Sequence, residues 1–123
     1  MSATAKKINL GEAFAALEDY WSPRIAGDVN DAQVKIAKIK GEFDWHAHEA
    51  EDEAFLVVKG AMRLEFRDHA IEMTEGDFLV VPRGVEHRPV AAEECWILMV
   101  EPSTTVNTGA ARTARTKLAL ERL

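Results

Sequence analysis

Cysteine is nearly absent from this 123-residue sequence, which contains only Cys95. A single cysteine cannot form an internal disulfide, so the fold does not depend on an oxidising compartment. Cys95 lies inside an apolar run, where we expect a buried, unreactive side chain. The first residues also lack the apolar central region of a signal peptide. Together these absences predict a cytoplasmic protein.

Long apolar runs and an excess of positive charge are missing as well. The longest apolar runs, such as Cys95–Val100, fall far short of the ~18–20 residues that a membrane-spanning helix needs. The net charge is −6, with 15 Lys and Arg against 21 Asp and Glu. A nucleic-acid backbone or an anionic membrane would select the opposite sign. We therefore expect neither nucleic acid nor a membrane as a partner.

What the sequence does contain is typical of one small globular domain spanning residues 1–123, with 47% apolar and 29% charged residues. From Gly41 onward, short apolar segments alternate with glycine-containing turns. Met62, Leu64 and Phe66 alternate with charged residues, as in a strand buried on one face. Phe78–Val81 and Cys95–Val100 are continuous apolar strands. This spacing predicts an all-β sandwich or barrel.

The flanking segments have a different character. Asn9 followed by Glu12 predicts the start of a short helix that runs to about Glu18. Asp28–Asp31 has turn chemistry. The strand that follows loses its alternation at Ile39, which predicts either a bulge or burial of both faces near Ala37. We divide the chain into an N-terminal helix and strand extension (8–31), a barrel core (32–101) and an irregular, locally basic C-terminal tail (102–123).

Four residues carry the chemistry. His46 and His48 are two apart, so on an extended strand they project to the same side. Glu53 opens the next apolar strand, and His87 follows a Pro-Arg-Gly corner. Three imidazoles and a carboxylate suit Fe(II), Mn(II), Zn(II), Ni(II) or Co(II). The remaining histidine, His69, is expected to be a solvated turn residue.

The same stretch resembles the cupin superfamily, and in particular its small single-domain members (the type 2 conserved barrel). The first motif of that family is matched by Gly41, His46, His48, Glu53 and Gly60, with four residues between His48 and Glu53 and six between Glu53 and Gly60. The second motif is matched by Gly76, Pro82, Gly84 and His87, while Ala91 replaces its trailing asparagine. The resemblance implies a small jelly-roll β-barrel with a metal held by the three histidines and Glu53.

The resemblance also implies a function. Such a metal keeps positions open for a ligand, as catalytic metals do and structural zinc does not. We expect a metal-dependent enzyme, of the dioxygenase or oxidoreductase kind, acting on a small polar organic molecule. Two alternatives stay open: an enzyme like the sugar-phosphate isomerases, and a non-catalytic module that binds or senses a small ligand.

Other residues are candidates for the surroundings of the metal. Phe55 and Val57 share the alternation phase of Glu53 and are predicted to line the substrate pocket. Arg83 and Arg88 flank the corner before His87, where they could engage an anionic substrate or simply face solvent. Asp44 shares the phase of His46, and it could orient a ring nitrogen of a ligand or lie on the surface. The nearby acidic residues Glu49, Glu51 and Asp52 are expected to form a solvated loop.

Exposed strand edges suggest self-association, since small sandwiches commonly cover them by dimerising. We expect a homodimer, with the segment Tyr20–Lys40 as the pairing element.

Overall fold

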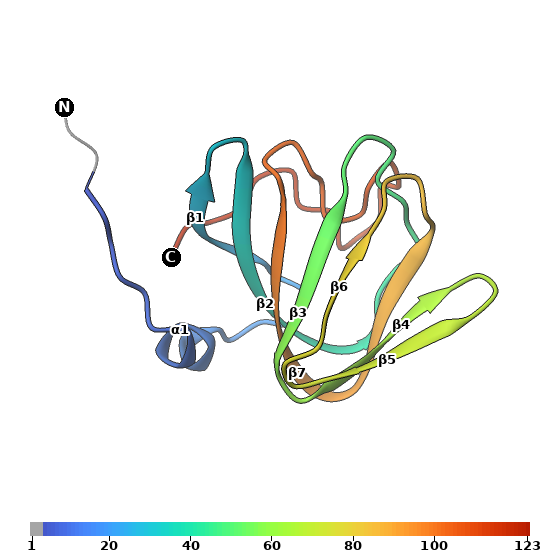
Figure 1. The fold of residues 1–123 in the computed structure, drawn as a ribbon, viewed down its shortest axis with the longest axis horizontal. Helices are drawn as coiled ribbons and strands as arrows, with labels where there is room; N and C mark the ends of the chain where they lie inside the picture. The colour runs from blue at the N-terminus through green and yellow to red at the C-terminus, as the bar shows by residue number, and fades with distance from the viewer. Residues whose placement is uncertain (1–3) are drawn as a thin grey trace.

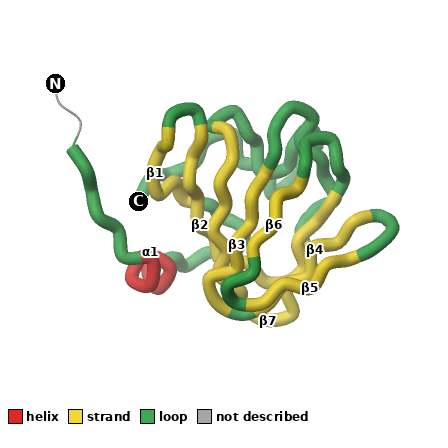
Figure 2. The backbone as a smooth tube through the Cα atoms, in the orientation of Figure 1, coloured by secondary structure: helices red, strands yellow, loops and turns green. Residues whose placement is uncertain are grey.

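The computed structural model describes residues 4–123, as one short helix and seven strands. The elements are α1 (Leu10–Ala16), β1 (Arg24–Val29), β2 (Ala32–Glu42), β3 (Glu53–Lys59), β4 (Ala61–Phe66), β5 (Ala70–Thr74), β6 (Phe78–Val81) and β7 (His87–Pro102). All strand pairs are antiparallel, and the sheet curls into a small barrel (Figures 1 and 2). The predicted all-β fold with a short N-terminal helix is confirmed.

Helix α1 begins where the sequence predicts it. The Asn9 side chain accepts a hydrogen bond from the backbone N–H of Glu12 at 2.9 Å. The helix ends at Ala16, before the predicted Glu18, because Leu17 already has an extended conformation. Phe14 is fully buried and stacks on Trp96 of β7, with ring centroids 4.8 Å apart. The helix therefore covers part of the outer face of the barrel.

Strand β2 is buried on both faces, which explains its broken alternation. Ile36 packs outward beneath α1, whereas Ala37 and Ile39 point into the barrel core. The register with β7 shifts between Ile39 and Gly41, as expected from the sequence. The hairpin between β1 and β2 turns at Asn30, which has a φ of 52°. Asparagine tolerates a positive φ better than most residues.

The central strand is β7, which pairs with β2, β3 and β4. Its residues Cys95, Ile97 and Met99 alternate into the core. Cys95 is buried and free, and burial raises the pKa of its thiol to about 11. This confirms that Cys95 is a buried side chain with little thiolate character.

Strand β6 lies at an edge of the sheet and pairs only with β3. Its apolar residues are not all buried, since 62% of Phe78 and 49% of Val80 are exposed. Only the alternate residues, Leu79 and Val81, face inward. The sequence of this strand is apolar throughout because both its inner and its outer face carry apolar side chains.

The C-terminal tail is irregular and packs against the barrel (Figure 1). Its end runs along β1, where Ile25 donates to Glu121 at 2.9 Å and Leu123 donates to Ile25 at 3.0 Å, all through backbone atoms. Within residues 4–123, no helix has the length and apolar character required to cross a membrane.

Candidate metal centre

Four side chains from three separate parts of the chain meet inside the barrel. His46 and His48 come from the segment between β2 and β3, Glu53 begins β3, and His87 begins β7. One ligand atom from each residue lies within 4.8 Å of the others, and all four residues are buried. Backbone hydrogen bonds in both directions, of 3.1 and 2.9 Å, join His46 to His87. The structure thus assembles the cluster expected from the motif spacing.

The rings of two histidines are oriented by backbone carbonyls. The Nδ1 atom of His46 lies 2.9 Å from the carbonyl oxygen of Asp44, and that of His87 lies 2.9 Å from the carbonyl of Val85. A carbonyl oxygen can only accept, so Nδ1 carries the proton and Nε2 keeps its lone pair in both rings. Metal-binding histidines commonly have such a partner on the second nitrogen.

Asp44 contacts the cluster through its backbone and not through its side chain. Its backbone oxygen orients His46, whereas its carboxylate bonds to the C-terminal tail. Thr113 Oγ1 donates to Asp44 Oδ2 at 2.6 Å, and Arg115 Nη1 donates to Oδ1 at 3.2 Å. Asp44 thus contacts a ring nitrogen of His46 through its backbone oxygen, while the tail engages its carboxylate.

The cluster fits a divalent cation. Among the described residues, neither ring nitrogen of His48 has a hydrogen-bond partner, although the side chain is 2% exposed. The carboxylate oxygen Oε1 of Glu53 lies 3.4 Å from Nε2 of His48 and 3.3 Å from Nε2 of His87. Buried polar atoms without partners are costly. A cation coordinated by these nitrogens and the carboxylate would remove that cost.

Electrostatics keep the cluster in a form ready to bind a cation. Burial, together with the nearby His87, lowers the pKa of His46 to about 4. Burial disfavours the ionised form of Glu53, but the neighbouring Glu101, His48 and His87 side chains outweigh burial and lower the pKa of Glu53 well below its usual value. At neutral pH, His46 is thus neutral with a free lone pair and Glu53 is negatively charged.

The lowered pKa of His46 gives a pH prediction for the metal-free protein. Between pH 6.5 and about 4, His46 is protonated in the unfolded state but neutral in the folded state, so acidification should destabilise the fold. The loss should approach roughly 3 kcal/mol at the acidic end. Chemical denaturation at several pH values measures it. The variant His46→Gln should lack this contribution, and an equal pH dependence in the variant would contradict the assignment.

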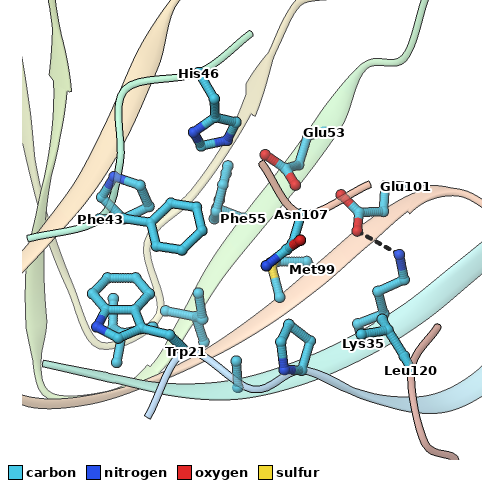
Figure 3. A pocket seen from close by; sticks show the side chains of 15 residues that line it. Trp21, Lys35, Phe43, His46, Glu53, Phe55, Met99, Glu101, Asn107 and Leu120 are labelled. Atoms are coloured by element: carbon cyan, nitrogen blue, oxygen red, sulfur yellow. Dashed lines mark hydrogen bonds and ion pairs between the residues drawn. The ribbon is translucent and has the colours of Figure 1, made fainter. Parts of the chain in front are cut away.

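An internal cavity adjoins the cluster, and His46 and Glu53 form part of its wall (Figure 3). The wall residues that were not anticipated from the sequence include Trp21, Lys35 and Glu101. Lys35 Nζ and Glu101 Oε1 form an ion pair of 2.7 Å, with both side chains 3% exposed. The sequence did contain a signal for both residues. Lys35 lies two residues before Ala37, and Glu101 lies two residues after Met99, so each shares a strand face with a core residue.

Burial and the neighbouring Glu53 carboxylate raise the pKa of Glu101 well above its usual value, although Lys35 opposes this shift. Two acidic side chains therefore stand next to one another inside the barrel, as Figure 3 shows. Only one of them is a candidate ligand of the metal.

The residues predicted to line the pocket have different positions. Phe55 does line the cavity, whereas Val57 lies in the core and outside the cavity wall. Arg83 is exposed, and its backbone N–H bonds to Asp52 at 2.9 Å. Arg88 lies on the outside, where it pairs with Glu65 at 2.8 Å and Glu42 at 3.1 Å. The structure therefore does not bring Val57, Arg83 or Arg88 to the cavity, because Arg88 is paired on the outside, Arg83 is exposed and Val57 packs in the apolar core.

The other titratable neighbours are peripheral. Glu49 and Asp52 are exposed, and the half-buried Glu51 accepts a hydrogen bond from Thr104 at 2.8 Å. His69 is exposed and stacks on Phe66 in the turn between β4 and β5. These residues stand outside the four-residue cluster.

A curled antiparallel β-barrel with a buried His-His-Glu-His cluster defines a protein of the cupin class. The cupin domain family (Cupin_2) matches residues 33–101, and the chain belongs to this family. The N-terminal helix and the C-terminal tail lie outside the matched residues.

Two solved structures are similar in sequence and fold. A cupin-2 domain containing protein from Shewanella frigidimarina is 44% identical, with a TM-score of 0.76, over 77% of this chain and 93% of that protein. The protein NMB1881 from Neisseria meningitidis is 33% identical, with a TM-score of 0.72, over 80% of this chain and 100% of that protein.

A curated relative is the uncharacterized protein YdbB of Bacillus subtilis, 39% identical over 62 residues. The match covers 50% of this chain and 55% of YdbB, so the chain spans about half the length of that relative.

Proposed function

We propose that this cupin is a divalent-metal-dependent enzyme, an oxidoreductase of the dioxygenase kind, acting on a small organic molecule. The observation that carries the proposal is the position of the cluster at the wall of a cavity, to which both His46 and Glu53 contribute. A purely structural metal would have no use for such a space. Fe(II) or Mn(II) suits the ligand set and the chemistry.

The residues of the chain have definite tasks in this reaction. His46, His48, Glu53 and His87 would hold the metal, which when bound supplies a redox-active Lewis acid. The apolar wall, which includes Phe55 and Met99, would position the substrate and exclude water. In a dioxygenation both oxygen atoms of O₂ enter the substrate, so no additional reductant is consumed. A cytoplasmic location is part of the same proposal.

Oxygen uptake tests the proposal. The protein is reconstituted with Fe(II) and supplied with small chelating diols and diketones, and O₂ consumption is followed with an electrode. Uptake that depends on both iron and substrate is expected, and the variant His48→Ala should abolish it. Interconversion of substrates without O₂ would support an isomerase instead. A probe that binds and is recovered unchanged across the panel would favour a binding or sensor module.

A homodimer is the second part of the proposal, and the outer face of the sheet is its basis. Across β7, β3 and β6, two cross-strand rows are apolar: Leu98, Leu56 and Phe78, and Val100, Ala54 and Val80. Helix α1 covers a neighbouring part of this face near Trp96 and leaves these rows partly bare. A flat antiparallel face of this kind can pack on its own copy about a two-fold axis.

The N-terminal segment also favours a second copy of the chain as the partner. Residues 4–7 are exposed and extend away from their own barrel (Figure 1), within reach of a second copy. The segment Tyr20–Lys40 is a less suitable pairing element than expected, because β1 and β7 occupy both edges of β2 and the tail residues Glu121 and Leu123 bond to Ile25 on the outer edge of β1. We therefore place the dimer on the outer face of β3, β6 and β7.

Charged substitutions on this face should separate the two copies. The double variant Phe78→Lys/Val80→Lys is expected to sediment as a monomer while the unaltered protein sediments as a dimer, because two lysines would be buried without partners. The control Val29→Lys alters an apolar residue of β1 that is 61% exposed, and it should remain dimeric. A wild-type monomer in sedimentation velocity would overturn the proposed dimer.

A further inference from the structure

The cavity beside the cluster has one polar wall, and the rest is apolar. Of its 15 lining residues, the polar ones are Lys35, His46, Glu53, Glu101 and Asn107. The first four of these lie along one side, as Figure 3 shows for the labelled side chains. Trp21, Phe43 and Phe55 supply aromatic surface, and Trp21 and Phe43 stack at 4.8 Å. A ligand for this cavity therefore needs an apolar body and a polar group at one end.

One polar atom of this wall has no partner among the described residues. Glu101 Oε1 accepts from Lys35, but Glu101 Oε2 is buried without a hydrogen bond. Asn107 is not available to it, since its amide bonds to the backbone of Arg115 and Lys117 at 2.8 Å each. A ligand that brings a hydrogen-bonding group to Oε2 would satisfy an atom that is costly to leave alone.

We propose that this cavity binds a small, uncharged molecule with an apolar, ring-sized body and a hydroxyl group, and that the hydroxyl bonds to Glu101 Oε2. A hydroxyl both donates and accepts, so it pairs with this carboxyl oxygen in either protonation state. The apolar body lies against Trp21, Phe43 and Phe55. This inference deepens the proposed function, on which it rests for the metal centre that borders the same cavity.

The charges of the cavity wall disfavour anionic ligands. A sugar phosphate would need free cations, but Lys35 is already paired with Glu101, and Arg83 and Arg88 lie outside the cavity. The ligand is therefore less polar than the sequence suggested.

Two probes of nearly equal shape test the inference: phenol, and toluene, in which a methyl group replaces the hydroxyl. Binding is measured by NMR titration with protein as purified and with protein freed of metal by EDTA. Phenol is expected to bind roughly 10–100-fold more tightly than toluene, because toluene would leave the buried Oε2 atom of Glu101 without a partner. Contacts from phenol to the methyl groups of Ala37 and Met99 should locate it in the cavity.

Two variants assign the preference to Glu101. The double variant Lys35→Met/Glu101→Leu removes the ion pair without leaving a lone charge, and its affinities for phenol and toluene should become equal. If it fails to fold, Ala37→Leu fills the cavity from a neutral wall position and should abolish binding of both probes.

Three outcomes would overturn the inference: equal binding of the two probes to the wild type, a phenol preference that survives in the double variant, or tighter binding of glucose 6-phosphate than of phenol. The measurement on metal-free protein distinguishes failure of the proposed metal enzyme from failure of the proposed ligand class. If the phenol preference is present in a protein that never binds metal, the proposed metal enzyme fails and the ligand class stands.

Discussion

Replacing Lys35 with methionine is expected to lower the free energy of unfolding by about 3–5 kcal/mol, the range for breaking a buried ion pair. The Lys35–Glu101 pair spans 2.7 Å, and each side chain is 3% exposed. Without Lys35, the Glu101 carboxylate stays buried next to the Glu53 carboxylate, with no cation to balance it. Because Lys35 opposes the upward pKa shift of Glu101, its removal should raise that pKa further. The loss should therefore shrink as the pH falls and Glu101 takes up a proton.

Denaturant unfolding of three variants at pH 8 and pH 5 measures this effect. The double variant Lys35→Met/Glu101→Leu should recover most of the loss, since an apolar pair of similar volume costs little. The control Arg122→Met breaks the exposed pair with Asp28, where the side chains are 56% and 45% exposed, and should cost under about 1 kcal/mol. If Lys35→Met were no more harmful than Arg122→Met, the buried pair would not contribute as described.

The second large effect is expected from Gly109→Ala in the C-terminal tail. Gly109 has a φ of +61°, and a Cβ atom there would lie 2.0 Å from the carbonyl oxygen of Ala47 and 2.9 Å from its carbon. Ala47 stands between His46 and His48, so the tail packs directly on the segment that presents two of the candidate ligands. The added methyl group must displace either the tail or that segment.

We expect Gly109→Ala to lower the free energy of unfolding by about 3 kcal/mol or more and to weaken metal binding. The matched control is Gly76→Ala, where φ is +87° but no atom lies within 4 Å of the added Cβ. It should show only the ~1–2 kcal/mol cost of a left-handed alanine. Hydrogen exchange at the amides of His46 and His48 should accelerate in Gly109→Ala alone. Equal behaviour of the two variants would mean that the tail does not support the cluster.

Sequence predicted the strands because they depend on local patterns. The cluster joins distant residues, and it could be predicted because His46, His48, Glu53 and His87 match the two cupin motifs; the structure places the four donors within 4.8 Å of one another. Alternation and glycine position were enough to expect short strands. The start of α1 was equally predictable, since the Asn9 side chain bonds to a residue only one turn away.

What could not be predicted depends on contacts between distant residues. Arg83 and Arg88 look free in the sequence, but the Glu65 and Glu42 carboxylates hold Arg88 on the outside. The tail carries no periodic pattern, so nothing local indicated that it would pack on Ala47. Glu101 follows an apolar run, and its pairing with Lys35, 66 residues earlier, becomes visible only when β2 and β7 lie side by side.

The central claim is that His46, His48, Glu53 and His87 bind a divalent metal, and elemental analysis of protein purified without a histidine tag tests it most directly. About one ion of Fe, Mn, Zn, Ni or Co per chain is predicted for the wild type. The variants His46→Ala and His87→Ala should retain less than about a tenth of it, since even residues that only support a metal ligand change affinity by about 10–100-fold. The control His69→Ala, which alters the exposed histidine outside the cluster, should keep the full content. A wild type that stays metal-free after exposure to all five ions, or variants that bind as much metal as the wild type, would contradict the account.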